Sequence, residues 1–461
     1  MNVPLRTWLA ALAVAAVAAA SATAASPKPS RAEASTEMEA GAGEARGLLE
    51  RFFSEENADA RQPLAEQFGK VAPDNWAAVK ALLHEAAPRP DLAPGTHTFE
   101  TPGEDPVPPV RYVLRVPEGY EPNAPAGYPL VIGCHGTGGK GADALRLVQR
   151  ILGPDLDRYL VACPDSPQPD IYRVDRVIVV YPLHVLADVR RRANVDADRT
   201  ILTGYSRGGY TTWAAVLFSP TAWAGAVPMA SWPLTDAGSD GAILYLQNVL
   251  NLAIQAHWGE KDIESGQTQG INTLSREAAA WFKGRPAHHF EGIEYAGQGH
   301  GLNLKHEAIR TFCASARRDP FPAEVKYLFH RLYQGRVSCV RVTEVTREEF
   351  DFRKRRVLRI QRREDLPNAK RAMWRNQGFE VTVRIPEGKN TVAIMARNVR
   401  TMEVELPAER LDFTQPVRVF VNHRTRYAKQ TGVDWVSLLE TARQTWDFER
   451  LVAGRVTVPA R

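Results

Sequence analysis

Between about residues 90 and 320, short apolar runs alternate with segments of helical periodicity. The helical segments fall at about residues 142–152, 177–193, 208–218, 271–283 and 303–316. The apolar runs are typical of buried strands and fall at residues 110–117, 128–136, 159–165, 199–206, 223–231, 252–262 and 288–297. Continuous apolar strands separated by helices predict an α/β fold, in which a mostly parallel sheet is covered by helices on both faces.

From residue 321 to 461 the pattern changes to strands and turns. Segments such as FEVTVRIPEG and PVRVFVN alternate apolar and polar positions and are separated by proline, glycine and asparagine. This alternation predicts an antiparallel, β-sandwich-like C-terminal domain. A helical segment, WVSLLETARQTWDFERL, and a last strand, AGRVTV, close the pattern.

The residues before about position 90 contain three predicted segments. Residues 1–25 combine a basic start, an apolar run and small residues, which is typical of a secretory signal peptide cleaved after Ala24 or Ala25. The apolar run is too short and too rich in alanine for a membrane anchor, which is the alternative. Residues 26–43 are rich in Ala, Glu, Ser and Pro and predict a disordered linker, and residues 44–89 carry the periodicity of a small helical prefix. We therefore expect a secreted or periplasmic protein without stable membrane insertion after cleavage.

Composition narrows the class of partner. The chain has 461 residues, 44% of them hydrophobic, and a formal net charge of +5, which favours a large core and offers no reason to expect nucleic acid. Cys134 and Cys163 each end an apolar strand and are expected to be buried free thiols, whereas a disulfide between Cys313 and Cys339 stays open. No Cys/His spacing indicates a metal site, so neither a metal nor another cofactor is expected. The oligomeric state is not defined by the sequence.

The stretch RTILTGYSRGGYTTW contains the pattern G-x-S-x-G around Ser206. A serine hydroxyl becomes a useful nucleophile when a sharp strand-to-helix turn holds it beside a base and an oxyanion site. Gly204 and Gly208 supply the small residues that such a turn needs, with a predicted strand before them and a predicted helix after them. The alternative is a serine in an ordinary glycine-rich turn. The context favours a nucleophile at Ser206.

Two backbone N–H groups are candidates for an oxyanion hole. The first belongs to Arg207 at the start of the helix, and the second to Thr137 in the loop HGTGG, which follows an earlier strand. A phosphate-binding loop is the rival interpretation of HGTGGKG. It fails because Cys134 replaces the required first glycine and no Ser or Thr follows Lys140.

The acid and the base should follow the nucleophile in the order Ser, Asp/Glu, His. Asp262 lies just after the strand that ends in HWGEKD, with Glu260 and Glu264 as alternatives. His300 lies between two glycines after the last strand and is the candidate base, while histidines such as His257 fall in strand or helix patterns typical of packing. In the predicted mechanism, His300 takes the Ser206 proton, Asp262 orients the imidazole, and an acyl-enzyme forms and is hydrolysed.

These segments resemble the α/β-hydrolase superfamily, and within it secreted esterases of the polyhydroxybutyrate-depolymerase and feruloyl-esterase type. The resemblance covers about residues 95–315 and is carried by YVLRVPEGY, YPLVIGCHGTGG, VDADRTILTGYSRGGYTTW, AGAVPMAS, HWGEKD and GQGHG. It implies an α/β-hydrolase fold at residues 90–320 and an enzyme that cleaves carboxylic esters. It implies triad roles for Ser206, Asp262 and His300, on small-molecule esters or on acyl groups linked to a polysaccharide or polyester.

Several residues near the motif invite a substrate-binding role. Arg207 replaces the Met or Leu common after the nucleophile in the family, so its side chain either favours an anionic substrate or forms an ion pair on the helix surface. Tyr205, Trp232 and Trp258 are tentative substrate-binding residues, with core packing as the alternative. The basic run FRKRRVLRIQRR (residues 352–363) is either a solvated strand face or a binding segment for an anionic polymer.

Two other functions compete with a serine esterase. The first is a peptidase resembling the prolyl-oligopeptidase group, which usually carries a propeller for which residues 26–90 are too few. The second is a non-catalytic, hydrolase-like binding module, against which the intact Ser–Asp–His order argues. Ester and peptide substrates separate these hypotheses.

Overall fold

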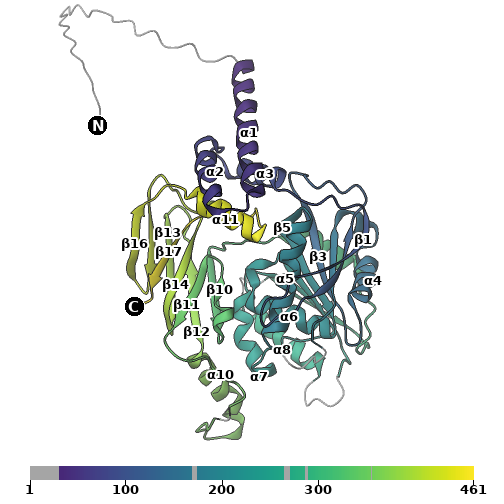
Figure 1. The fold of residues 1–461 in the computed structure, drawn as a ribbon. Coiled ribbons are helices and arrows are strands. Elements are labelled where there is room, and N and C mark those ends of the chain that lie inside the picture. Colours follow the sequence, from purple (N-terminus) through teal and green to yellow (C-terminus); the bar gives the residue numbers. More distant parts are fainter. Residues whose placement is uncertain (1–30, 169–173, 264–269, 286–288, 355) are drawn as a thin grey trace, which may run out of the picture.

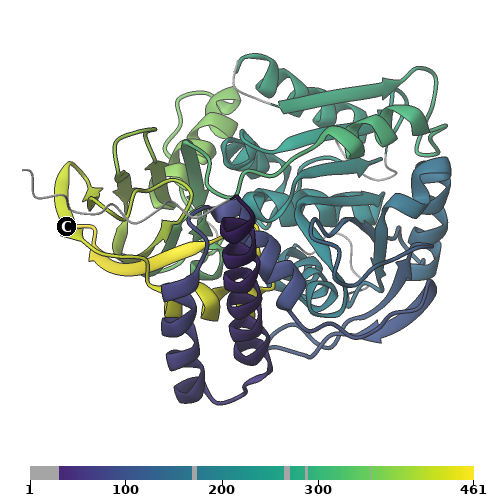
Figure 2. The ribbon, with the colours of Figure 1, turned by 90° about the horizontal axis from the view of Figure 1, so that it is seen from above.

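The computed structural model describes residues 31–168, 174–263, 270–285, 289–354 and 356–461. The predicted signal peptide and the first five residues of the predicted linker lie outside this part of the chain. Two β-containing parts lie side by side, and the N-terminal helices lie over the line between them (Figures 1 and 2).

Three helices form the N-terminal part, namely α1 (Arg31–Ser54), α2 (Ala58–Val71) and α3 (Trp76–Ala86). The predicted linker at residues 26–43 is wrong from Arg31 onward, because this stretch belongs to α1. Its sequence is rich in Ala and Glu, which are strong helix formers, and no proline follows until α1 has ended. The predicted helical prefix is confirmed.

The N-terminal helices pack on the C-terminal helix α11 (Trp435–Thr445) rather than on each other alone. Phe68 contacts Trp435 edge to face at 5.2 Å between ring centroids, and Phe53 contacts Phe448 at 5.8 Å. The buried Arg61 donates two hydrogen bonds to the carboxylate of Glu440. This helical layer therefore connects two segments that are far apart in the sequence.

The central sheet has eight strands in the order β1-β2-β4-β3-β5-β6-β7-β8. The first two pairings, β1 with β2 and β2 with β4, are antiparallel, and all the others are parallel. The strands are β1 (Gly95–Glu100), β2 (Arg111–Val116), β3 (Tyr128–Cys134), β4 (Leu160–Pro164), β5 (Val195–Tyr205), β6 (Gly225–Met229), β7 (Ala253–Gly259) and β8 (His289–Tyr295). The predicted mostly parallel sheet is confirmed.

Helices cover both faces of this sheet because successive strand residues point in opposite directions. On β3, Leu130 and Ile132 face a core shared with α5 (Arg176–Arg192), α6 (Arg207–Phe218) and α8 (Ile271–Lys283), whereas Val131 faces α4 (Gly141–Leu152) and α9 (His306–Ser315). A further helix, α7 (Gly238–Tyr245), follows β6. An apolar run without alternation, as in YPLVIGC, is the sequence of a strand buried on both sides.

Two further sheets form the C-terminal part and enclose a separate apolar core. One sheet has the order β10-β11-β14-β17 and the other β16-β15-β13-β12-β9, and all pairs are antiparallel except β13 with β15. The strands are β9 (Glu324–Phe329), β10 (Arg336–Val337), β11 (Val340–Val345), β12 (Phe379–Arg384), β13 (Thr391–Arg397), β14 (Val399–Pro407), β15 (Pro416–Val421), β16 (Arg424–Gln430) and β17 (Val452–Pro459). A β-sandwich-like domain is what the alternating pattern predicts.

The basic run at residues 352–363 is not a strand face. Its described residues form an irregular, mostly exposed segment that leads into α10 (Leu366–Gln377), and Val357 is 97% exposed. Consecutive arginines leave no alternating apolar face that could pair with a sheet. The segment and α10 protrude from the β-rich part beside α7 (Figure 1).

All four cysteines are buried and free. Cys134 is the last residue of β3 and Cys163 the last but one of β4, as expected for small apolar side chains in a core. Cys313 packs between α9 and the central sheet, whereas Cys339 belongs to the core of the β-rich part. These two cysteines therefore do not form the disulfide that the sequence left undecided. In the described part of the chain, no helix combines the length and apolarity needed to cross a bilayer, and no group of His, Cys, Asp and Glu is arranged for a metal.

Burial of His257 makes stability depend on pH. Burial and the nearby Lys305 lower the pKa of His257 from 6.5 to about 3, and its ring bonds to Tyr295 and Gln255 in the neutral form. The unfolded chain therefore binds a proton that the folded chain does not, and stability is lost as the pH falls from about 6.5 towards 3. The histidine contributes on the order of 1.4 kcal/mol per pH unit within that window.

We expect His257→Gln to have a flatter stability profile than the wild type between pH 6.5 and pH 4 in urea titrations. The difference between the two stability profiles reports the titration of His257 alone, because all other groups titrate in both proteins. One of them is Asp198, whose pKa burial raises to about 6. Identical pH slopes for the two proteins would contradict this expectation.

Candidate active site

Ser206 occupies a strained turn between β5 and α6. Its φ of 56° and ψ of −119° are rare for a residue with a side chain, and its N–H donates to Met229 O at 2.9 Å. The strand ends at Tyr205 and the helix begins at Arg207, so the turn is a single residue wide. This geometry presents the serine hydroxyl at the carboxyl end of the parallel strands.

The glycines around Ser206 are required by close backbone contacts. A Cβ on Gly204 would lie 2.3 Å from Gly208 C, and a Cβ on Gly208 would lie 2.0 Å from Cys134 O. A Cβ on Gly209 would lie 2.3 Å from the hydroxyl of Ser231. Strand β5, helix α6 and the neighbouring strands thus approach more closely than any side chain would allow.

His300 and Asp262 complete a hydrogen-bonded line that begins at Ser206. The Nε2 atom of His300 is 2.8 Å from the Ser206 hydroxyl, and its Nδ1 atom is 3.1 Å from each carboxylate oxygen of Asp262. The carboxylate can only accept, so Nδ1 carries the proton and Nε2 accepts from the serine. Asp262 is 1% exposed, while 47% of the His300 side chain is exposed.

The loops that carry the acid and the base are bonded to each other. Glu260, an alternative acid in the sequence, accepts a hydrogen bond from Gly297 N at 2.6 Å instead of bonding to the imidazole. Asn272 donates from its side chain to Glu260 O and from its backbone to Asp262 O. Glu264, the other alternative, lies outside the described residues.

Tyr205 supports the histidine loop. Its hydroxyl donates to His300 O and accepts from Leu302 N at 3.0 Å, and its ring lies 6.0 Å from the imidazole. Its hydroxyl is therefore occupied by the backbone of the histidine loop, at His300 itself and two residues after it. This arrangement argues against the tentative substrate-binding role and for a role in placing His300.

The loop HGTGG lies beside the nucleophile. A Cβ on Gly136 would be 3.8 Å from Ser206 Cβ, the N–H of Gly139 donates to Gly136 O, and Thr137 is exposed at the tip. Both predicted oxyanion donors, Thr137 N and Arg207 N, therefore belong to segments next to Ser206.

His135 is a residue of the site that the sequence did not single out. Its Nδ1 atom donates to Gly136 O at 2.7 Å, and its Nε2 atom accepts from Ser166 N at 2.9 Å, so the buried ring connects two loops. The adjacency of His135 to the glycines was the available signal. Its hydrogen-bond partner, Ser166 N, follows β4, and only the fold brings that segment to His135.

The Arg207 side chain is buried, so the predicted ion pair on the helix surface is wrong. Only 6% of the residue is exposed, and its Nη2 atom donates to the Ser166 hydroxyl. Helix α6 is covered on all sides, because each of its residues is buried. The guanidinium consequently points inward beneath the loop after β4.

The two tryptophans are core residues rather than walls of an open site. Trp258 is 4% exposed and packs over Gly292 of β8, where a Cβ would lie 2.6 Å from its ring. Trp232 is 3% exposed and contacts Tyr210 edge to face at 4.6 Å. The alternative of core packing is correct for both, because bulky apolar rings fill the space between α6, α8 and the sheet.

No protein-family model and no curated protein matches the chain. Solved structures with a related arrangement include a thermostable esterase (20% identity, TM-score 0.35, 48% of this chain and 63% of that one). Others are a putative dipeptidyl aminopeptidase IV from Bacteroides ovatus (14% identity, TM-score 0.38, 48% and 36%) and a mutant feruloyl esterase module from Clostridium thermocellum complexed with sinapinate (14% identity, TM-score 0.38, 52% and 91%). The chain thus spans less than two thirds of the first two.

These likenesses are too low to carry an argument about function, and they include both an esterase and a peptidase. The fold is evident from the protein's own geometry. The chain has a mostly parallel eight-stranded sheet that is covered by helices on both faces. A strained serine lies between β5 and α6, and Asp262 and His300 follow the last two strands. This arrangement is the α/β-hydrolase fold.

Proposed function

We propose that the protein is a serine hydrolase that cleaves carboxylic esters through an acyl-enzyme. The single observation that carries the proposal is the hydrogen-bonded line from Ser206 through His300 to the buried Asp262, which starts at a strained strand-to-helix turn. An ordinary glycine-rich turn does not place its serine against an imidazole whose other nitrogen bonds to a buried carboxylate.

The mechanism follows from this line. His300 Nε2 takes the proton from the Ser206 hydroxyl while the serine oxygen bonds to the carbonyl carbon of the ester. The resulting oxyanion accepts hydrogen bonds from Arg207 N and Thr137 N. His300 then gives its proton to the departing alcohol oxygen, and water repeats the sequence on the acyl-enzyme.

The surroundings of Ser206 support this chemistry electrostatically. Ser206 lies at the positive end of α6, which stabilises negative charge that develops beside it. A single well-placed oxyanion donor is worth about 3 to 4 kcal/mol of barrier lowering in related chemistry. The carboxylate of Asp262 stabilises the imidazolium that forms on His300.

Substrate comparison tests the reaction class. We expect the purified protein to hydrolyse p-nitrophenyl acetate and to leave a peptide p-nitroanilide intact, because the described residues before the hydrolase part form three helices instead of a propeller. Peptide cleavage without ester cleavage would favour the peptidase. A lack of both activities, together with a Ser206 inert towards a fluorophosphonate, would favour the non-catalytic module.

Substitution of Asp262 tests the orienting acid. Asp262→Asn keeps the shape of the side chain but favours the wrong tautomer of His300, so we expect kcat to fall by about 10⁴-fold. Glu260→Gln is the matched control, because its amide oxygen can still accept from Gly297 N and it does not contact the imidazole. Steady-state kinetics in which Glu260→Gln falls as far as Asp262→Asn would contradict the assignment.

We also propose that the enzyme is exported, to the periplasm or outside the cell, and that it acts on small-molecule esters or on acyl groups linked to a polymer. The pattern of residues 1–25 supports export. N-terminal sequencing of protein from the extracytoplasmic fractions should find a start immediately after Ala24 or Ala25. Retention of Met1 by protein confined to the cytoplasm would contradict export.

A further inference from the structure

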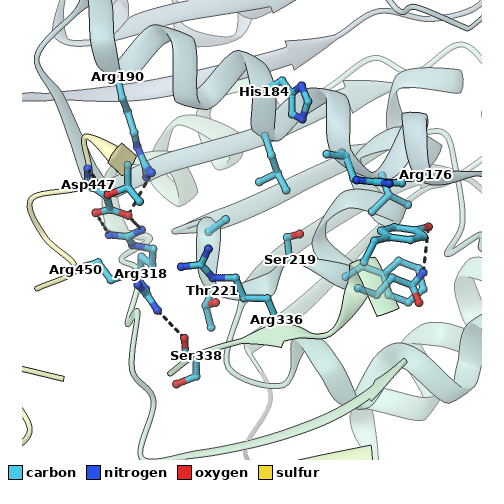
Figure 3. A pocket seen from close by; sticks show the side chains of 18 of the residues that line it. Arg176, His184, Arg190, Ser219, Thr221, Arg318, Arg336, Ser338, Asp447 and Arg450 are labelled. Carbon is cyan, nitrogen blue, oxygen red and sulfur yellow. Dashed lines mark hydrogen bonds and ion pairs between the residues drawn. The ribbon is translucent and has the colours of Figure 1, made fainter. Parts of the chain in front are cut away.

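A cavity of about 320 Å³ lies between α5 of the hydrolase part and the β-rich part, away from the catalytic line (Figure 3). We call it the interdomain cavity. Its lining comes from segments that are distant in sequence. They are residues 176–190, 218–222, 333–338 and 445–450, together with Glu104 and Arg318. Ligand sites occur preferentially at such junctions, and this volume is within the range of small-molecule pockets.

One end of the interdomain cavity is rich in guanidinium groups. Arg318 donates two hydrogen bonds to Asp447, at 2.6 and 2.8 Å, and Arg190 lies 3.2 Å from the same carboxylate. Arg336 and Arg450 both bond to Glu405. Within the described residues, Asp447 and Glu405 therefore each bind more than one of these guanidinium groups. The four arginines at this end are Arg190, Arg318, Arg336 and Arg450 (Figure 3).

Several buried donors at this end have no hydrogen-bond partner among the described residues. They are Arg190 Nε and Nη2, Arg450 Nη1 and the Ser338 hydroxyl. The side chains of Arg190 and Arg450 are only 8% and 10% exposed, and Ser338 is 2% exposed. These atoms are closed to solvent, so an anion in the cavity would offset the positive charge of the guanidinium groups rather than bond to these atoms directly.

The surroundings of Arg190 disfavour its positive charge. Burial lowers the pKa of Arg190, and the neighbouring Arg318 and Arg450 lower it further, while Asp447 opposes them. The Arg336 guanidinium differs from the others, because its side chain is half exposed and reaches the middle of the cavity beside Thr221 (Figure 3).

The other end of the interdomain cavity combines apolar and aromatic side chains with Arg176 and with His184, which lies 3.8 Å from Glu104. Val179, Leu183 and Phe218 line it, and the Arg176 guanidinium lies over the ring of Tyr333 at 5.5 Å. A ligand that fits both ends has an apolar, preferably flat body and one anionic group. An inorganic anion would leave the apolar end unused.

We propose that the interdomain cavity binds a small organic acid, with the carboxylate towards Arg336, Arg450 and Ser338 and the hydrocarbon body against Leu183, Phe218 and Tyr333. Because both parts of the protein line the cavity, such a ligand stabilises their junction. The proposal concerns a second site and does not rest on the catalytic role of Ser206.

The test measures binding to Ser206→Ala protein, in which no ester chemistry occurs. Calorimetry and thermal unfolding are carried out with trans-cinnamate, with the neutral cinnamamide and with inorganic phosphate. We expect cinnamate to bind and to raise the unfolding midpoint by a few degrees, and the other two to do neither. Equal responses to cinnamamide or to phosphate would overturn the assignment of an organic acid.

Two variants locate the ligand. Arg336→Gln should weaken cinnamate binding at least tenfold, whereas Arg341→Gln, an exposed arginine opposite it on β11, should leave binding unchanged. Leu183→Glu, which puts a negative charge at the apolar end, should weaken binding without touching the guanidinium cluster. Unchanged affinity in both Arg336→Gln and Leu183→Glu, or binding lost only after Ser206 of the wild type is phosphonylated, would overturn the proposal.

Discussion

Replacement of Ser206 by alanine lowers kcat for ester hydrolysis by about 10⁵- to 10⁶-fold, and the folded structure is retained. This magnitude is expected for loss of the nucleophile from a triad that acts as one unit. The residual rate comes from binding and from the oxyanion donors alone. Alanine has no better access than serine to a φ of 56°, so the strain of the turn remains and stability changes little.

The measurement is a burst and steady-state assay with p-nitrophenyl acetate at matched protein concentrations. His300→Ala should fall by a similar factor, and Ser206→Ala combined with His300→Ala should cost little more than either alone. Additive losses would mean that the two side chains act separately. Full activity in Ser206→Ala would remove Ser206 from the mechanism.

Gly208→Ala has the largest expected effect on stability. Its Cβ would lie 2.0 Å from Cys134 O and 2.9 Å from His135 O, and neither atom can move without disturbing β3 and the loop beside the nucleophile. We expect the free energy of unfolding to fall by more than about 4 kcal/mol, a large part of the usual stability of a domain. Poor solubility, or a low urea midpoint for the hydrolase part, is the expected outcome.

Gly47→Ala is the control for this substitution. It lies inside α1, nothing is within 4 Å of the Cβ that it would gain, and alanine is favoured over glycine in a helix interior by about 1 kcal/mol. Its urea midpoint should be unchanged or slightly higher. Wild-type stability and activity in Gly208→Ala would show that α6 does not approach β3 as closely as described.

Most of the central sheet was predictable because its strands are buried on both faces. Runs such as YPLVIGC indicate a buried strand once helices flank them. The sequence pattern correctly located the strands β2 to β8 and the helices α4, α5, α6, α8 and α9. Strand β1 was missed because GTHTFE is an edge strand with mostly polar, exposed residues. Helix α7 was missed because the run GSDGAILY begins with glycines and is short.

The line from Ser206 to Asp262 was predictable because its order along the chain reflects the order of the strands. Each member follows a strand at the same edge of the sheet, so sequence position alone brings the three together. The surroundings were not predictable in this way. The roles of Tyr205, Glu260 and His135 depend on hydrogen bonds between loops of different strands. Burial of the Arg207 side chain depends on the packing of α6 against the sheet and on the loop after β4.

The measurement that tests the central claim most directly is labelling with a fluorophosphonate, followed by peptide mapping. Such a probe reacts with a serine whose proton can pass to a neighbouring base, and hardly at all with ordinary serines. The proposed mechanism predicts one adduct, on the peptide that contains Ser206, and none in Ser206→Ala. An unlabelled wild-type protein, or an adduct on another serine, would contradict an activated nucleophile at Ser206.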